Sequence, residues 1–475
     1  MSAPLPKERV LATLNPDGSR HWIRPRLSPG RYLMARRMFA YFLIVLFAVL
    51  PYVRINGKPA LLLDIVHRRF HILGTSFFPT DTMLLALFMI SMFVSIILIT
   101  ALLGRVWCGW ACPQTVYMEF LFRPIERFFD GAPGSKQKIG GAKGARKAMK
   151  YFVFFLCAIF VSHTFLSYFV GTEQLYSWVK GSPARHPLAF LVMAAVTALM
   201  LFDFGFFREQ VCLVACPYGR FQSAMLDRDT MIISYDKNRG EPRGAKKRKK
   251  QAGADLSLPV VDDDPAGDCI DCRMCVTTCP TGIDIRDGLQ MECIGCAQCI
   301  DACNAVMKKV GRPLGLIRYT SQRAVESGKA RVFRPRLILY VLVLGALASL
   351  FVGTLLTRGD ADLTVLRGRG RPFVETGDGM IANTIRVKVA NRLDEPQEFT
   401  ITVSDLEGAS LASGEGLTFE VAGGEIGWRD VQVIVPAGAF RDGEARATFG
   451  VTTEQGFKAE RSYPLLGPVR RASQR

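Results

Sequence analysis

Several patterns that would assign a chain to a familiar class are missing from this sequence. There is no Cys-x-x-Cys-His motif, which excludes covalent attachment of a c-type haem. There is no glycine-rich phosphate loop and no dinucleotide-binding fingerprint. Residues 1–37 hold no early apolar segment with a small-residue cleavage site, so we expect no cleaved signal peptide. Residues 358–475 contain no cysteine, which excludes thiol chemistry from that region.

What is abundant is apolar sequence and positive charge. The 475 residues have room for several domains, 49% of them are hydrophobic, and the formal net charge is +18. Such a charge could indicate nucleic-acid binding, but the cations lie mainly beside long apolar runs. Membrane orientation explains that placement better. We therefore expect the lipid bilayer as a partner and no nucleic acid.

Five apolar runs are candidates for membrane spans. They are Met38–Val53, Thr82–Leu103, Tyr151–Val170, Leu188–Phe207 and Leu337–Leu356. The first is short for a span, but the arginines at its ends could reach the interface. Five spans place the two termini on opposite sides of the membrane. The sequence thus predicts a multi-pass α-helical membrane protein.

The distribution of cations predicts the orientation of these spans. Residues 1–37 are rich in arginine, and residues 104–150 carry nine lysines and arginines, whereas the loop between the third and fourth spans has only Lys180 and Arg185. Positive loops favour the cytoplasmic side. We expect a bacterial inner-membrane protein with residues 1–37 and 208–336 in the cytoplasm and residues 358–475 in the periplasm.

Two cysteine runs between the fourth and fifth spans carry the clearest chemical signal. Both have the spacing Cys-x2-Cys-x2-Cys-x3-Cys, and thirteen residues separate Cys279 from Cys293. This is the doubled spacing of a bacterial ferredoxin with two [4Fe–4S] clusters, in which the fourth cysteine of each run binds the other cluster. The predicted ligand sets are Cys269, Cys272, Cys275 and Cys303 for one cluster, and Cys293, Cys296, Cys299 and Cys279 for the other.

Zinc and disulfides are the alternative interpretations of these runs. Zinc sites use separated cysteine pairs rather than two runs of four, and disulfides require an oxidising compartment. Both therefore fit the pattern less well than iron. Gly282 and Gly295 supply backbone freedom near the sulfur atoms, and Asn304 replaces the proline that follows Cys279 in the first run.

A second pair of motifs follows the second and fourth spans. Each reads Cys-x3-Cys-Pro and begins five residues after its apolar run, and the two lie 104 residues apart. The repetition suggests a weak internal duplication that brings the two pairs together at the inner membrane surface. The four candidate catalytic thiols are Cys108, Cys112, Cys212 and Cys216.

Four converging thiols would form either a soft-metal site, with copper as a candidate, or a redox dithiol site. We expect nearby cations such as Arg105 and Arg208 to lower the pKa of these thiols. The alternative is that they are buried apolar residues at helix ends. That alternative fits the isolated Cys157 better.

Other polar residues give weaker signals. Asp203 lies near the inner end of the fourth span, where a carboxylate is a functional candidate. His163, in the third span, is equally consistent with packing. His67 and His71 could bind a metal or haem, although no further ligand is evident. Residues 237–268 resemble a linker whose basic run, residues 246–250, could contact anionic lipids but more often is only solvated.

Residues 358–475 change to a strand-forming pattern. Apolar and polar residues alternate over Thr384–Val389, Glu398–Val403, Leu417–Val421, Val431–Val435 and Ala445–Thr452. Turn signals such as Gly423-Gly424 separate these runs. We expect a small all-β, Ig-like sandwich.

The predicted order of domains along the chain is a tail (1–37), four spans with the first cysteine motif in their loop (38–207), the second motif and a linker (208–268), an α+β ferredoxin-type domain (269–336), a fifth span (337–356) and this sandwich.

This order of parts resembles the FixG family, also called CcoG or RdxA, which comprises accessory proteins of cbb3-type cytochrome c oxidase. The resemblance covers nearly the whole chain and rests on both Cys-x3-Cys-Pro motifs, the doubled ferredoxin run, the fifth span and the β domain. It implies a role in biogenesis of that oxidase, through reduction of Cu(II) to Cu(I). It also implies copper chaperones or transporters and oxidase assembly factors as partners. The electron donor is not identified by the sequence.

Two other functions are open at this stage. Membrane ferredoxins of the NapH type share four spans, the Cys-x3-Cys-Pro motifs and two clusters, and carry electrons from quinol to periplasmic reductases. The fifth span and the β domain argue against that function here. The other is a non-redox assembly scaffold with structural clusters.

Overall fold

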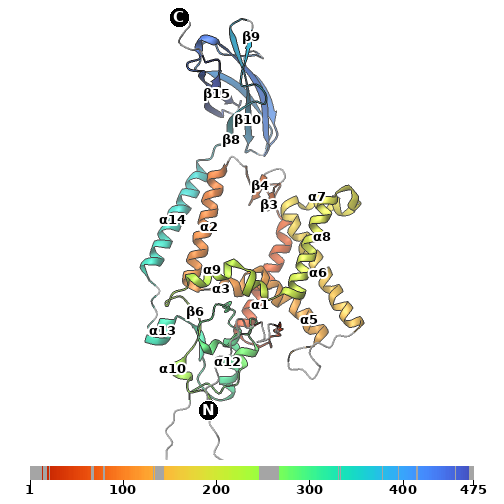
Figure 1. Ribbon diagram of the computed structural model, residues 1–475, viewed down its shortest axis with the longest axis vertical. Helices are drawn as coiled ribbons and strands as arrows, with labels where there is room; N and C mark the ends of the chain where they lie inside the picture. Colours follow the sequence, from red (N-terminus) through yellow and green to blue (C-terminus); the bar gives the residue numbers. More distant parts are fainter. Residues whose placement is uncertain are drawn as a thin grey trace, which may run out of the picture. The chain divides into compact units, whose positions relative to one another are not determined.

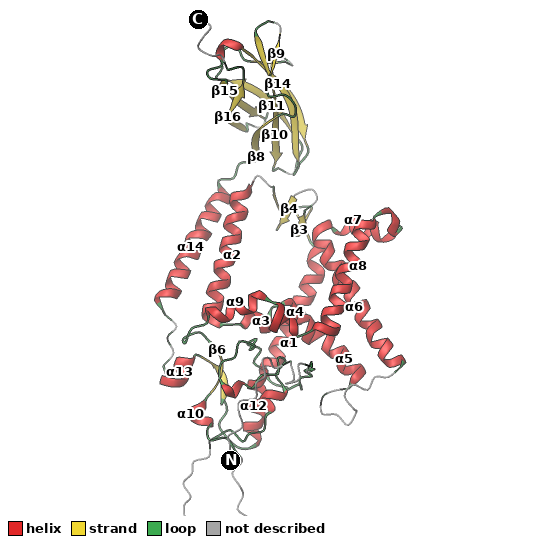
Figure 2. Cartoon of the chain, viewed as in Figure 1, coloured by secondary structure: helices red, strands yellow, loops and turns green. Residues whose placement is uncertain are grey.

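The computed structural model describes residues 13, 19–20, 22–65, 69–78, 81–131, 133, 144–244, 267–329, 331, 333–376, 378–393, 395–412, 414, 416–454 and 456–469. The chain forms two compact units, one comprising Met1–Asp64 with Leu87–Ser349 and the other Ile65–Ala86 with Leu350–Arg475. The helices and strands are drawn in Figures 1 and 2. Each unit is described by itself.

Within the described residues, five helices are long and apolar enough to cross a membrane, which indicates a membrane protein. They are α1 (Arg31–Val49), α2 (Thr82–Leu103), α6 (Ala145–Val170), α8 (Pro187–Phe202) and α14 (Pro335–Leu356). All five expected apolar runs are therefore helical. The first begins at Arg31 rather than Met38, because Asp301 accepts hydrogen bonds from the free N–H groups of Tyr32 and Leu33.

Aromatic packing joins the helices of the first unit. Phe122 stacks on Phe204 with ring centroids 4.3 Å apart, and Phe154 meets Phe122 edge-on at 5.0 Å. Phe122 and Phe204 both lie in π-helical turns, η3 (Met118–Phe122) and η5 (Asp203–Phe207). Such turns occur frequently at functional sites, and here two of them lie against each other.

Each Cys-x3-Cys-Pro motif folds into a short helical turn followed by a proline-initiated helix. The first motif spans α3 (Val106–Trp110) and α4 (Pro113–Tyr117), which continues through η3 into α5 (Arg123–Asp130). The second spans the π-helical turn η6 (Val211–Ala215) and α9 (Pro217–Met225). Proline fits the first helical position because no intrahelical N–H is needed there. The duplication inferred from sequence thus has a matching local structure.

The ferredoxin-type part of the first unit is built on one antiparallel strand pair. Strand β6 (Ile232–Tyr235) pairs with β7 (Ile317–Thr320). Both cysteine loops lie between these two strands in the sequence. The other elements are α10 (Lys237–Gly240), α11 (Met274–Thr277), η7 (Ile285–Asp287), α12 (Gln298–Lys309) and α13 (Gln322–Ser327). Residues 237–244 and 267–268 belong to this fold, since Arg239 pairs with Asp268, so the predicted linker is shorter than 237–268. Its basic run lies outside the described residues.

The second unit is a β-sandwich, as expected. All five predicted strands are present, one with the predicted bounds and four within longer strands. One sheet has the order β12-β14-β10-β8 with β9 paired to β10, and the other the order β13-β11-β15-β16. The strands are β8 (Ala361–Arg367), β9 (Val374–Thr376), β10 (Met380–Asn391), β11 (Gln397–Ser404), β12 (Ser410–Leu411), β13 (Leu417–Val421), β14 (Ile426–Pro436), β15 (Glu444–Thr452) and β16 (Lys458–Leu466). Their alternate residues form one buried core.

Shorter elements complete both units. The first unit also contains η1 (Leu50–Tyr52), β1 (Arg54–Ile55), β2 (Lys58–Pro59), β3 (Leu61–Asp64), α7 (Thr172–Lys180) and η4 (Pro183–Arg185). The second contains β4 (Arg69–Ile72), β5 (Thr75–Phe77) and η8 (Ala437–Ala439). In the second unit Asp81 forms ion pairs with Arg358 and Arg392, which fix its connecting segment to the sandwich.

Candidate iron–sulfur and thiol site

The two cysteine loops of the ferredoxin-type part repeat the same backbone conformation. Asp271 and Arg273 in the first loop have φ values of 52° and 54°, and the equivalent Gly295 and Ala297 in the second have 69° and 60°. Non-glycine residues adopt positive φ rarely, because it crowds the side chain against the backbone. Its occurrence at matched positions shows that the cysteine spacing dictates one loop shape, used twice.

The fourth cysteine of the second run lies beside the first run. Burial, together with the nearby thiols of Cys272 and Cys269, raises the pKa of Cys303 to about 11. Burial likewise raises the pKa of Cys275 to about 12, with Cys303 and Cys272 among the groups adding to it. These four cysteines are the first ligand set expected from the sequence, and the fold brings them together.

The fourth cysteine of the first run lies beside the second run. Burial raises the pKa of Cys299 well above its ordinary value, and the thiols of Cys296, Cys293 and Cys279 add to this. All four thiols also line one small cavity, together with Cys275 and apolar side chains such as Ile283. The second expected ligand set therefore also surrounds a common space.

The donor set of both groups fits iron–sulfur clusters better than a single ion. All thirteen cysteines are free thiols. Within the described residues, no three His, Cys, Asp or Glu side chains form a group that could hold one metal ion. A tetrahedral zinc site needs sulfur atoms about 4 Å apart. A four-iron cluster needs a wider spread, because each thiolate binds a different iron atom.

A buried guanidinium group next to the second loop supports the same fit. Arg36 is only 1% exposed, and its Nε donates to the Gly109 carbonyl oxygen at 2.9 Å. Its Nη1 and Nη2 atoms have no hydrogen-bond partner among the described residues. Burial raises the pKa of Cys296 to about 12, and Arg36 counteracts that rise. Unpaired buried cationic donors are costly, so an anionic group such as a cluster is the expected partner.

The four cysteines of the Cys-x3-Cys-Pro motifs also converge. Burial raises the pKa of Cys212 to about 12, and the thiols of Cys112, Cys108 and Cys216 each add to the rise. The four sulfur atoms therefore lie within electrostatic range of one another. Cys108 is buried, and its Sγ donates to Gln222 Oε1 at 3.1 Å.

Arg105 is the cation beside these thiols. Its Nη2 lies 3.9 Å from Cys108 Sγ. Burial raises the pKa of Cys108 and of Cys112, and Arg105 counteracts part of that rise. The expectation that cations would lower these pKa values overall was wrong, because burial outweighs Arg105. Arg208 instead forms an ion pair with Glu126.

The first Cys-x3-Cys-Pro motif packs directly on the second cysteine loop. A side-chain carbon at Gly109 would lie 2.6 Å from the Ile294 carbonyl oxygen and 2.9 Å from the Cys296 backbone. A side-chain carbon at Gly295 would lie 3.2 Å from the Arg105 carbonyl oxygen. Glycine at both positions permits this approach of two backbones. The thiol group and the second ligand set thus share one interface.

Comparison with known families agrees with this geometry. Residues 207–322 match the family described as 4Fe-4S dicluster domain, and residues 85–132 match a 4Fe-4S binding domain family. Residues 351–468 match the IG-like fold at the C-terminus of FixG. The match over 85–132 includes the first Cys-x3-Cys-Pro motif.

Similar whole proteins are known. The chain is 32% identical to "Protein RdxA" of Cereibacter sphaeroides, over 88% of this chain and 90% of that protein. It is 30% identical to "Nitrogen fixation protein FixG" of Rhizobium meliloti, over 90% and 88%. "Protein RdxB" of Cereibacter sphaeroides is 33% identical over 80% and 81%. The chain belongs to the FixG/RdxA family.

Membership of the FixG/RdxA family, together with the two 4Fe-4S domain matches, establishes an iron–sulfur protein. The remaining candidates from the sequence are described by their own contacts. Asp203 accepts a hydrogen bond from Gln114 Nε2 at 2.9 Å. His163 Nδ1 lies 2.9 Å from the Ile159 carbonyl oxygen within its own helix. His71 is on strand β4. His67, the other histidine of the candidate pair, lies outside the described residues. Cys157 packs against an apolar core, as expected.

Sequence reasoning missed the residues that surround the cysteines. Arg36, Gln222 and Tyr218 had no motif to mark them. Gln222 Nε2 donates to the Tyr218 hydroxyl at 2.8 Å, so the two residues hold the acceptor for Cys108 in place. The one sequence feature that could have pointed to these residues is the position of Tyr218, directly after the proline of the second motif.

Proposed function

We propose that this protein is a membrane-bound electron-transfer protein that reduces Cu(II) to Cu(I) during assembly of a cbb3-type oxidase. In this proposal two [4Fe–4S] clusters are held by the two crossed ligand sets, one with Cys303 and one with Cys279 as the fourth ligand. Bound clusters supply one-electron transfer. The reductant is a cytoplasmic or quinol electron donor, and one electron converts one Cu(II) ion into one Cu(I) ion.

One observation carries the proposal most directly. The Gly109 backbone approaches the Ile294–Cys296 loop so closely that no side chain fits between them. Cys108, beside Gly109, packs with Ile294 and Cys296, so the motif thiols meet the second ligand set through Cys108. Electron transfer falls off steeply with distance, so a thiol site in contact with a cluster loop is well placed to receive electrons.

The residues around the thiols suit a site that receives and releases copper. Thiolates are soft ligands that favour Cu(I) over harder ions, so binding there would favour reduction. The thiols as placed do not form a closed single-ion site within the described residues. An open arrangement suits a substrate that leaves after reduction. Arg105, beside Cys108, would stabilise the thiolate form during metal binding.

Orientation and partners complete the proposal. Arginine-rich residues 1–37 and the basic loop at 104–150 favour a cytoplasmic ferredoxin-type part and a periplasmic β-sandwich. Copper chaperones or transporters would bring the ion to the thiols. Oxidase assembly factors would meet the sandwich. An alternative carrier function of the NapH type predicts instead that quinol reduces the clusters without any requirement for copper.

The protonation of the motif thiols favours a second use, in which they cycle between a dithiol and a disulfide. Burial raises the pKa of Cys108 and its Sγ donates to Gln222 Oε1, and both features favour the neutral thiol. Two such thiols form a disulfide with release of two protons and two electrons, which would reduce two Cu(II) ions. Two electrons from the donor would then restore the dithiol.

The test is a cupric-reductase assay on protein purified without oxygen. The variant replaces all four motif cysteines by serine, and electron paramagnetic resonance (EPR) spectra establish that both clusters are retained. The matched control is Cys157→Ser, which removes a thiol outside the site. We expect the quadruple variant to lose copper binding and Cu(II) reduction while the control keeps both.

The contrary outcome is equally clear. If the quadruple variant reduces Cu(II) at the unchanged rate, the motif thiols are structural and the proposed reduction site is wrong. Mass spectrometry of the partly reduced enzyme separates the two mechanisms, because only dithiol cycling leaves a disulfide among these cysteines.

A further inference from the structure

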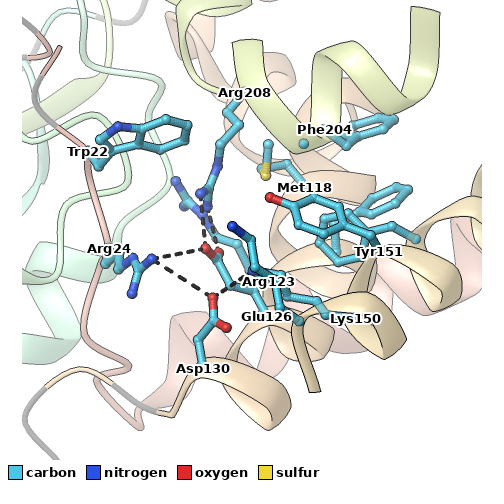
Figure 3. A pocket seen from close by; sticks show the side chains of 14 residues that line it. Trp22, Arg24, Met118, Arg123, Glu126, Asp130, Lys150, Tyr151, Phe204 and Arg208 are labelled. Carbon is cyan, nitrogen blue, oxygen red and sulfur yellow. Dashed lines mark hydrogen bonds and ion pairs between the residues drawn. The ribbon is translucent and has the colours of Figure 1, made fainter. Parts of the chain in front are cut away.

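A second candidate site lies at one end of the helices α6 and α8. A cavity of about 260 Å³ opens there between the chain at Trp22 and the two π-helical turns η3 and η5 (Figure 3). Its lining residues are Trp22, Arg24, Met118, Phe122, Arg123, Glu126, Asp130, Lys147, Lys150, Tyr151, Phe154, Phe204, Gly205 and Arg208. The proposed redox function uses none of them.

The lining is predominantly cationic. Arg123 forms ion pairs with Glu119 and Glu209, two carboxylates that do not line the cavity. The other four lining cations are Arg24, Lys147, Lys150 and Arg208, and the lining itself holds two carboxylates, Glu126 and Asp130. Arg208 also lies 3.8 Å from Glu209. Counted against all four carboxylates, Glu119 and Glu209 included, the five lining cations leave an excess of one positive charge at the cavity.

The two carboxylates are already occupied by the most buried cations. Arg208 Nη2 lies 2.7 Å from Glu126 Oε2, and Lys150 Nζ lies 2.9 Å from Asp130 Oδ2. Burial favours a higher pKa for Glu126, but Arg208 and the other guanidinium groups outweigh it and hold that pKa below its ordinary value. Both carboxylates are therefore engaged in ion pairs inside the wall of the cavity.

The remaining cations have capacity for a further anion. Arg24 approaches Glu126 and Asp130 only at 3.9 and 3.8 Å, and its buried Nη1 has no hydrogen-bond partner among the described residues. In Figure 3 its guanidinium group points toward the two carboxylates, across the space from Tyr151. Lys147 is exposed at the rim of the same cavity, on the first turns of α6.

We propose that this cavity binds the phosphate group of an anionic ligand. Basic pockets between spans at the cytoplasmic surface bind phosphate-bearing lipid head groups, and Trp22 and Tyr151 are residue types that favour the membrane interface. The same chemistry would accept free phosphate. Arg24 and Lys147 are the residues that contact the ligand, and Arg208 and Lys150 hold the wall.

The site also touches the ferredoxin-type part. Arg123, in the wall, donates from Nη2 to the Pro280 carbonyl oxygen at 3.4 Å, directly after Cys279. The wall of the cavity therefore contacts the turn that supplies one cysteine of the second ligand set. The anion site itself does not depend on the presence of clusters.

The experiment compares two double variants of the full-length protein in lipid nanodiscs. Arg24→Gln with Lys147→Gln removes two cations from the cavity. Arg26→Gln with Arg146→Gln removes two exposed cations that are close in sequence but do not line it. The probes are phosphatidylglycerol, at increasing fraction in phosphatidylcholine, and inorganic phosphate. Bound lipid is counted by native mass spectrometry, and the melting temperature reports binding of either probe.

We expect the cavity variant to bind the anionic probe about thirtyfold more weakly than the unaltered protein, and the control to bind within a factor of about two. A response to phosphatidylglycerol alone identifies a lipid site, and a response to inorganic phosphate identifies a soluble ligand. If neither probe binds, or if both double variants lose affinity equally, there is no anion site in this cavity.

Discussion

Gly109 and Ile294 are in backbone contact, since a side-chain carbon on the glycine would lie 2.6 Å from the isoleucine carbonyl oxygen. The two residues come from segments on either side of the third and fourth spans. This contact unites the membrane-associated thiols with a predicted cluster loop, and any change at Gly109 acts on both.

Substituting Gly109 therefore tests the interface. Gly109→Ala should destabilise the first unit by about 1–3 kcal/mol, because an added methyl group forces two backbones apart. The measurement is the free energy of unfolding in detergent, followed by loss of cluster absorbance. Gly345→Ala is the matched control, since Gly345 has open space around it. Equal stability of the two variants would show that the contact is loose.

Iron content tests the crossed ligand sets. The protein prepared without oxygen should contain about eight iron and eight acid-labile sulfide per chain. Cys275→Ser and Cys296→Ser should each alter a different cluster, which EPR spectra of the two variants would distinguish. A preparation that contains only zinc, or two variants with the same spectral change, would contradict the assignment.

Arg36 should tune one cluster and leave the other unchanged. Removing a buried positive charge disfavours the reduced, more negative form of a cluster, so Arg36→Met should lower the reduction potential of the cluster at Cys296 by tens of millivolts. Redox titration followed by EPR measures this shift. Arg36→Lys should restore part of it, and Arg37→Met is the control. An unchanged potential would mean that the guanidinium group has only a packing role.

Topology can be tested with reporters fused to the chain. A reporter active only in the periplasm should be active after Arg475 and silent after Asn238, because the arginine-rich N-terminal region favours a cytoplasmic start. The opposite pattern would reverse the orientation and would place the ferredoxin-type part outside the cytoplasm.

Local patterns explain what the sequence could predict. The cysteine spacing fixes loop shape within a few residues, so Asp271 and Gly295 adopt the same conformation at matched positions. The apolar runs and the alternating strands are likewise local features. Strand β16 was missed because Lys458–Leu466 contains Pro464 and lacks clean alternation, and β8 was missed because it follows so soon after the fifth span.

Contacts between distant segments explain what the sequence could not predict. Arg36 reaches Gly109, and Asp301 reaches Leu33 across 268 positions. Arg36 stands in no motif, and Asp301 lies in the second cysteine run only as one of the unspecified residues between Cys299 and Cys303. The pKa of the motif thiols was misjudged for a related reason. Nearby arginines are visible in sequence, whereas the burial that outweighs them is a property of the fold.

The bond between Asp301 and Leu33 also has a consequence for biosynthesis. At a translation rate of about 5–20 residues per second, roughly 10–50 seconds separate synthesis of the first helix from synthesis of its cap. During that interval the first N–H groups of α1 have only water as a hydrogen-bond partner. Only folding of the segment that carries Cys299 and Cys303 completes this helix end. A nascent chain that fails to build this segment keeps an exposed helix end, which quality-control proteases could recognise before the protein reaches its partners.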